Sequence, residues 1–130
     1  MQCPEVIELS IKQLLLNKLD LVTGKNKFTN LPIGIGAEVI TFETVKWLDE
    51  NTIDEFREDT TSYVYNHKTP IKVEGVQVPN SWTQSSQSIT VDTPSDMIKL
   101  KKIIWAITNK NPFKAKSMTP LTKKIKDCKK

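Results

Sequence analysis

Residues 88–97 read Ser-Ile-Thr-Val-Asp-Thr-Pro-Ser-Asp-Met, which joins the pattern of a strand to the pattern of a helix start. The first four residues predict a short buried strand that ends at Asp92. Thr93 is then a suitable N-cap, Pro94 suits the first helical position, and Asp96 lies three residues after the cap, as in a capping box. The predicted helix carries its apolar face on Met97, Leu100, Ile104 and Ile107.

The chain before this stretch alternates helices and strands in the same way. Pro4 and the spacing of Ile7, Ile11, Leu14 and Leu15 predict an amphipathic helix over 5–18. We expect further strands at 19–23, 37–42 and 71–78, the last with a bulge or a two-strand ribbon at Gly75, and further helices at 43–49 and 53–66, with loops at 25–32 and 80–87. This order predicts an α/β fold, in which a layered sheet carries flanking helices.

Composition sets the limits of this fold. The 130 residues are 38% hydrophobic and 26% charged, with four Gly, which indicates one globular domain. Residues 1–108 hold eleven basic and fourteen acidic groups, whereas 109–130 hold eight Lys and one acidic residue, Asp127. We therefore expect a domain over 1–108 and a Lys-rich tail over 109–130. The tail lacks interleaved aromatic residues, so we do not expect a nucleic-acid partner.

Cysteines and apolar runs indicate the compartment. Cys3 and Cys128 lie at opposite ends of the chain and match no zinc or disulfide pattern. No run approaches the roughly eighteen apolar residues of a membrane span, and the start lacks the pattern of a signal peptide. We expect a cytoplasmic protein with no membrane partner.

Asp92 is the first candidate functional residue. A carboxylate at the end of a strand and directly before a helix can hold Mg²⁺ against a phosphate. The alternative is that Asp92 hydrogen-bonds its own turn, whereas Asp96 is expected to cap the helix.

Four ordered motifs resemble the cytidylyltransferases that make CMP-activated sugars, with the best likeness to the spore-coat-polysaccharide branch beside the acylneuraminate enzymes. Ile89–Met97 is similar to their "V-D-T-P-E-D" segment, and Gly36–Thr44 to their "G-x-x-x-E-V-F-S-F-E-A-L" region. Arg57–His67 resembles "R-E-H-V-T-P-Y-I-Y-x-H", and Cys3-Pro4 resembles the "G-D-C-P" strand end. The similarity spans about residues 2–107.

The resemblance implies a partial, Rossmann-like nucleotidyltransferase fold. It also implies nucleotidyl transfer, in which a hydroxyl of an acidic sugar attacks the α-phosphate of CTP and pyrophosphate leaves. Asp92 would hold Mg²⁺, and Glu38 and Arg57 would bind the sugar. Arg57 is the only Arg of the chain, and a surface pair with Asp54 or a neighbour is the alternative for it.

The chain corresponds to the second half of these enzymes. The sequence has no counterpart of their Arg/Lys-Ser-Arg-rich CTP loop, and Gln2 stands where the family has an Asp metal ligand. We therefore expect a truncated or split relative that is not self-sufficient in catalysis and needs a nucleotide-binding partner chain. The alternative is a non-catalytic dimerising or ligand-binding module. Half of a doubly wound sheet would expose an apolar face and an unpaired strand edge, so we expect a homodimer.

Overall fold

The computed structural model describes residues 3–83 and 88–108. The Lys-rich segment 109–130 and Gln2, both part of the sequence-based expectations, lie outside these residues.

A small mixed sheet forms the centre of the fold. Strand β1 (Leu21–Thr23) lies in the middle, with β2 (Glu38–Ile40) on one side and β3 (Val73–Gly75) on the other. Strand β2 is antiparallel to β1, with Val39 opposite Val22, and β3 is parallel to β1. All three residues of β1 are buried, because the strand has a neighbour on each edge and helices around it. The α/β class expected from the sequence is therefore present.

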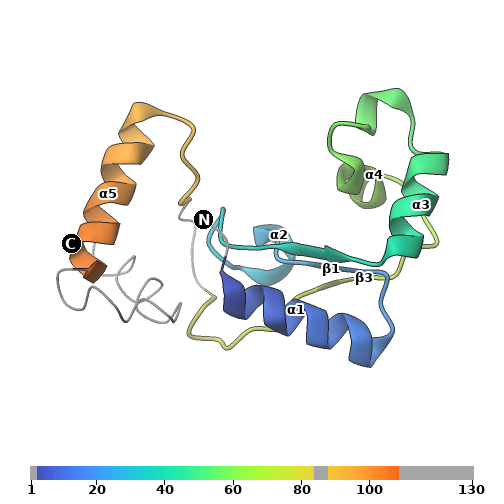
Figure 1. The fold of residues 1–130 in the computed structure, drawn as a ribbon, viewed down its shortest axis with the longest axis horizontal. Helices are drawn as coiled ribbons and strands as arrows, with labels where there is room; N and C mark the ends of the chain where they lie inside the picture. The colour runs from blue at the N-terminus through green and yellow to red at the C-terminus, as the bar shows by residue number, and fades with distance from the viewer. Residues whose placement is uncertain (1–2, 84–87, 109–130) are drawn as a thin grey trace.

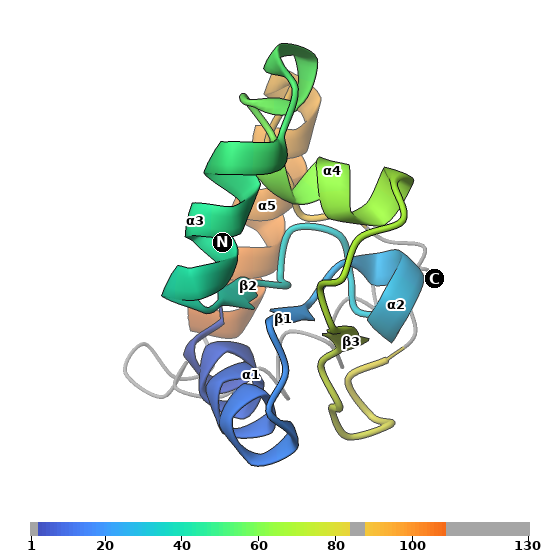
Figure 2. The same ribbon diagram turned by 90° about the vertical axis from the view of Figure 1, so that its right-hand side faces the viewer.

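Helices lie on both sides of this sheet (Figures 1 and 2). Helix α1 (Pro4–Asn17) packs below β1 and β2, with Val6, Ser10 and Leu14 buried. Helix α2 (Asn26–Thr29) and helix α4 (Thr60–Asn66) lie on the opposite side, where the rings of Phe28 and Tyr65 pack together.

The remaining elements complete the chain. Helix α3 (Phe42–Asn51) follows β2 directly and begins at Thr41, whose hydroxyl accepts a hydrogen bond from the Thr44 amide. A 3₁₀ turn, η1, covers Asp54–Phe56, and α5 (Pro94–Thr108) stands beyond one end of the sheet (Figure 1). No helix among the described residues is long and apolar enough to cross a membrane.

Several sequence-based expectations were wrong in detail. The expected helix over 53–66 is divided into η1 and α4 by a turn at 57–59, because the Asp59 backbone is not helical, with φ −126° and ψ 74°. The Asp59 carboxylate accepts the Ser62 hydroxyl at 2.9 Å in this turn. The expected loop at 25–32 contains the short helix α2. Phe28 of this helix packs on the ring of Tyr65.

The expected strand at 88–91 is also wrong. Ser88 makes one isolated parallel bridge to Ile33, and no longer ladder forms because the chain turns at Gly34, whose φ is +94°. The expected strand over 71–78 is reduced to β3 alone.

The buried faces of two helices differ from the predicted ones. In α5, Ile103 is buried, while Met97 and Ile104 are exposed. In α1, Ile11 and Leu15 are exposed, because Val6, Ser10 and Leu14 face the sheet instead.

Candidate functional site

Glu38 stands at the centre of a polar cluster that joins β2, β1 and α4. Its Oε1 accepts hydrogen bonds from the Thr23 hydroxyl at 3.1 Å and from the Tyr65 phenol. Its Oε2 accepts the Thr61 hydroxyl at 2.8 Å. Thr61 and Tyr65 lie four residues apart on α4, so one helix face presents both donors to Glu38.

Lys25 completes this cluster. Its Nζ lies 3.6 Å from Oε1 of Glu38 and 4.4 Å from the centre of the Tyr65 ring. The ammonium is therefore held by an ion pair and a cation–π contact at once. The Lys25 amide also donates to the Thr23 hydroxyl at 3.1 Å, which fixes the backbone at the end of β1.

Burial raises the pKa of Tyr65 well above its usual value, and the hydrogen bond to Glu38 raises it further. Both effects act in the same direction, since a phenolate would be poorly solvated and would face the Glu38 carboxylate. Tyr65 consequently remains a neutral hydrogen-bond donor over the physiological pH range.

A cavity of about 430 Å³ opens beside Glu38. Its walls include Lys25, Asn26, Gly24, Gly34 and Gly36 as well as Glu38. Its volume lies in the range of about 300–1,000 Å³ that is common for small-molecule sites. The three glycines add no side chain to the walls, so backbone atoms border much of the space.

At Gly24 and Gly36 the cavity wall has no room for a side chain. A Cβ on Gly24 would lie 2.5 Å from Cα of Gly36, closer than unbonded carbon atoms approach. The Gly24 amide donates to the Ala37 carbonyl at 2.7 Å, which continues the β1–β2 ladder by one residue beyond the Thr23–Glu38 pair. The glycines therefore allow the two chains to meet beside the cavity.

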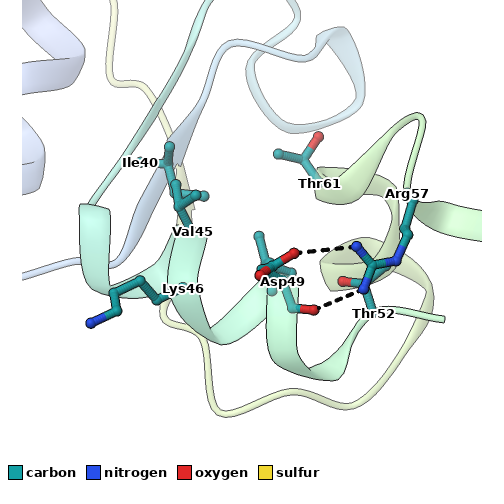
Figure 3. A pocket seen from close by; sticks show the side chains of 8 residues that line it. Ile40, Val45, Lys46, Asp49, Thr52, Arg57 and Thr61 are labelled. Carbon is teal, nitrogen blue, oxygen red and sulfur yellow. Dashed lines mark hydrogen bonds and ion pairs between the residues drawn. The ribbon is translucent and has the colours of Figure 1, made fainter. Parts of the chain in front are cut away.

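Arg57 lies in a different cavity, of about 420 Å³, between α3 and α4 (Figure 3). Its Nη1 donates to Oδ1 of Asp49 at 3.2 Å, and its Nη2 donates to the Asp49 carbonyl at 3.2 Å (Figure 3). The two cavities share no described lining residue. Thr61 connects them, because it lines the Arg57 cavity and donates to Glu38. The structure thus does not bring Glu38 and Arg57 into one pocket.

Asp92 lies in the exposed turn before α5. Its carboxylate has no hydrogen-bond or ion-pair partner within residues 3–83 and 88–108, so the alternative of a bond to its own turn is not realised there. Asp96 instead makes the capping box: its Oδ2 accepts the Thr93 amide at 3.0 Å, and its amide donates to the Thr93 hydroxyl at 3.2 Å. The hydrogen bond from Thr93 lowers the pKa of Asp96.

The chain just before Asp92 contacts two residues that line the Glu38 cavity. The Ile89 amide donates to the Ile33 carbonyl at 2.9 Å, and Thr90 lies against Gly34. Ile33 and Gly34 both line the cavity. Asp92 follows two residues after Thr90. No group of three or more His, Cys, Asp or Glu side chains gathers to hold a metal in the part of the chain that the structure describes.

Four members of the cluster were missed by sequence reasoning: Thr23, Lys25, Thr61 and Tyr65. Thr61 and Tyr65 lie within the Arg57–His67 motif, and their spacing of four is a usable signal for one helix face. Lys25 follows Gly24 in a segment read as a loop, and only the tertiary fold brings it to Glu38.

No protein-family model matches the chain, and neither the curated proteins nor the solved structures gave a match. The resemblance to cytidylyltransferases therefore rests on the four motifs of the sequence.

Proposed function

We propose that this chain binds the acidic sugar of a CMP-sugar cytidylyltransferase reaction, in the cavity beside Glu38. The observation that carries the proposal is the position of Glu38. This residue belongs to the motif that resembles the family's "E-V-F" segment, and its carboxylate lines a cavity with the volume of a ligand site. A sugar offers many hydroxyl donors, and a carboxylate is an acceptor for them.

The hydrogen bonds of Glu38 divide its two oxygens. Thr23, Tyr65 and Lys25 approach Oε1, whereas only Thr61 donates to Oε2 among the described residues. A carboxylate oxygen accepts about two hydrogen bonds. Oε2 thus keeps acceptor capacity for a sugar hydroxyl, and the side chain is 26% exposed. The other contacts hold the carboxylate in place before any ligand arrives.

We expect catalysis to need a CTP-binding half as well, because the sequence has no counterpart of the CTP loop of the enzymes that it resembles. In the proposed reaction the sugar hydroxyl forms a bond to the α-phosphorus of CTP, the bond to pyrophosphate breaks, and the hydroxyl proton passes to solvent or a base. A CTP-binding half would provide the phosphate loop and complete a larger Rossmann-like sheet. Mg²⁺ is usually bound by one or two carboxylates together with substrate phosphates, so the single carboxylate of Asp92 suits a place beside a nucleotide. By itself the chain would bind sugar without turning it over.

Calorimetric titration with N-acetylneuraminic acid tests the sugar site. We expect saturable binding to the unaltered chain and a loss of about tenfold or more with Glu38→Gln, since hydrogen bonds to a charged group contribute about 1.5–3 kcal/mol. Glu8→Gln is the matched control, because Glu8 pairs with Lys12 on the exposed face of α1. Equal affinity of the Glu38→Gln variant would refute the proposed site.

The second candidate function is a dimerising module, which the outer edge of β2 favours. Hydrogen bonds at Gly24–Ala37 and at Asp20–Thr41 mark the alternating ladder between β1 and β2. In this pattern the backbone groups of Glu38 and Ile40 point away from β1, and no described strand pairs with them. An open edge of this kind is a template for another strand.

Apolar side chains lie next to the same edge. Phe42 and Val45, at the start of α3, are 71% and 44% exposed. In a homodimer, two β2 strands would pair antiparallel and cover these side chains. Changing both residues to Lys should shift the chain toward monomer in light scattering, whereas Leu16→Lys, at an exposed position of α1, should not. An unaltered chain that is monomeric at micromolar concentration would contradict the dimer.

A further inference from the structure

We propose that Lys25, rather than Arg57, binds the carboxylate of the sugar and so selects an acidic sugar over a neutral one. This inference rests on the proposed function and assigns the cation of the same site. It arises from a difference between two cavities, since Lys25 lines the one that contains Glu38, and Arg57 lines the other.

Arg57 is already engaged where it lies. Two of its nitrogens donate to Asp49, one to the side chain and one to the backbone, both at 3.2 Å (Figure 3). A ligand carboxylate at Arg57 would lie beside the Asp49 carboxylate on the same guanidinium, in a cavity that Glu38 does not line.

Among residues 3–83 and 88–108, no group accepts a hydrogen bond from the Lys25 ammonium, whose donors can therefore serve a ligand. Its contact with Oε1 of Glu38, at 3.6 Å, is longer than a hydrogen bond, and its contact with Tyr65 is made to the face of the ring. An ammonium has three N–H donors. The Lys25 side chain is also 36% exposed, so a ligand in the cavity can reach it.

The surroundings hold the ammonium without using those donors. The Lys25 and Lys27 ammonium groups lie 4.4 and 4.9 Å from the centre of the Tyr65 ring, and together they fix this ring. The Lys25 amide bond to Thr23 fixes the backbone below. A cation placed in advance loses less side-chain entropy when it binds a carboxylate.

Two carboxylates and two ammonium groups lie around Lys25 and Tyr65. Glu38 and Asp59 are the carboxylates near Lys25, and Lys27 is the second ammonium on Tyr65. The Asp59 carboxylate accepts a hydrogen bond from the Ser62 hydroxyl, which lowers its pKa, and the Lys25 charge acts in the same direction. Of these four groups only Glu38 and Lys25 line the cavity, where they offer a ligand an acceptor and a cation side by side.

The test compares N-acetylneuraminic acid with its methyl ester, which keeps the sugar hydroxyls and removes the charge. Calorimetric titration of the full chain should show the acid binding about tenfold to a hundredfold more tightly than the ester. Lys25→Gln should weaken binding of the acid about tenfold or more and so remove its preference over the ester. Lys27→Gln is the matched control, because Lys27 lies over Phe28 and Tyr65 but does not line the cavity; it should retain the preference. Circular dichroism of each variant checks that the fold is intact.

The outcomes separate the inference from the proposed function. Equal binding of acid and ester, or a preference that survives Lys25→Gln, would overturn the role of Lys25 while the sugar site stands. A preference lost with Arg57→Gln and kept with Lys25→Gln would assign the carboxylate to Arg57 and overturn the inference. Binding of neither ligand would overturn the sugar site and the inference with it.

Discussion

The Tyr65 phenol donates a hydrogen bond to Oε1 of Glu38, across 27 residues of sequence. This bond ties α4 to β2, and the face of the same ring carries the Lys25 ammonium at 4.4 Å. One tyrosine therefore positions both charged groups of the candidate site. Loss of Tyr65 would remove one contact of the carboxylate and one contact of the cation at the same time.

The first prediction concerns the ionisation of Tyr65. Its pKa in the folded chain is raised above the value of about 10 found in unfolded chains. The neutral phenol therefore stabilises the fold fully below about pH 10, and this stabilisation is lost as the pH rises toward the folded pKa. Glu38→Gln removes the charge that faces the phenolate, so the pKa of Tyr65 should fall.

Tyrosinate absorbance during an alkaline titration measures this pKa. The chain has two tyrosines, so the difference between the unaltered chain and Tyr65→Phe identifies the Tyr65 step. If Glu38→Gln leaves that step at the same pH, the hydrogen bond does not carry the effect.

The second prediction concerns the close approach of Gly24 and Gly36, which follow β1 and precede β2. Gly24→Ala places a Cβ 2.5 Å from Cα of Gly36, and backbone cannot move aside as a flexible side chain can. We expect a loss of about 1–3 kcal/mol in the free energy of unfolding, as for other overpacked sites. Urea denaturation measures it, with Glu50→Ala on the exposed surface of α3 as the control. A change of less than about 0.5 kcal/mol, typical of surface substitutions, would show that the strands can separate at this point.

The third prediction separates Asp92 from its neighbour Thr93. Thr93→Ala removes the N-cap of α5 and should cost about 1 kcal/mol, whereas Thr93→Ser keeps the hydroxyl and most of the stability. Asp92→Asn should leave the melting temperature unchanged, because no described residue bonds to the Asp92 carboxylate. Thermal unfolding followed by circular dichroism compares the three variants.

Asp92→Asn is consequently a clean variant for the metal proposal. In a complex with a CTP-binding half, it should weaken binding of CTP in the presence of Mg²⁺ and leave sugar binding in the Glu38 cavity unchanged. Nucleotide affinity that does not depend on Asp92 would argue against its role as a ligand.

The sequence predicted the parts of the fold that local chemistry decides. Pro4 and the apolar spacing after it predicted α1 to within a residue, and Thr93, Pro94 and Asp96 predicted the start of α5 together with its capping box. Such signals lie within one turn of helix and need no tertiary contact.

Tertiary contacts decided the rest. Ser88–Val91 has the residues of a strand, yet a strand needs a neighbour, and only Ile33 offers one before the chain turns at Gly34. Similarly, Glu38 could be singled out from its motif, but the place of Lys25 depends on a fold that brings α4 over β1. Arg57 was grouped with Glu38 because both lie in family-like motifs, and the spacing along the chain could not reveal that they line separate cavities.

The central claim is that the sugar binds in the cavity beside Glu38, and the glycines of the chain allow a direct test. Gly24, Gly34 and Gly36 line the cavity, and Gly75, the fourth glycine, lies in β3 outside the set of lining residues. Amide signals of a ¹⁵N-labelled chain should be followed by NMR while N-acetylneuraminic acid is added. We predict that the signals of Gly24, Gly34 and Gly36 shift together and saturate, while the signal of Gly75 stays in place. Stationary signals for the three cavity glycines at saturating sugar would contradict the claim.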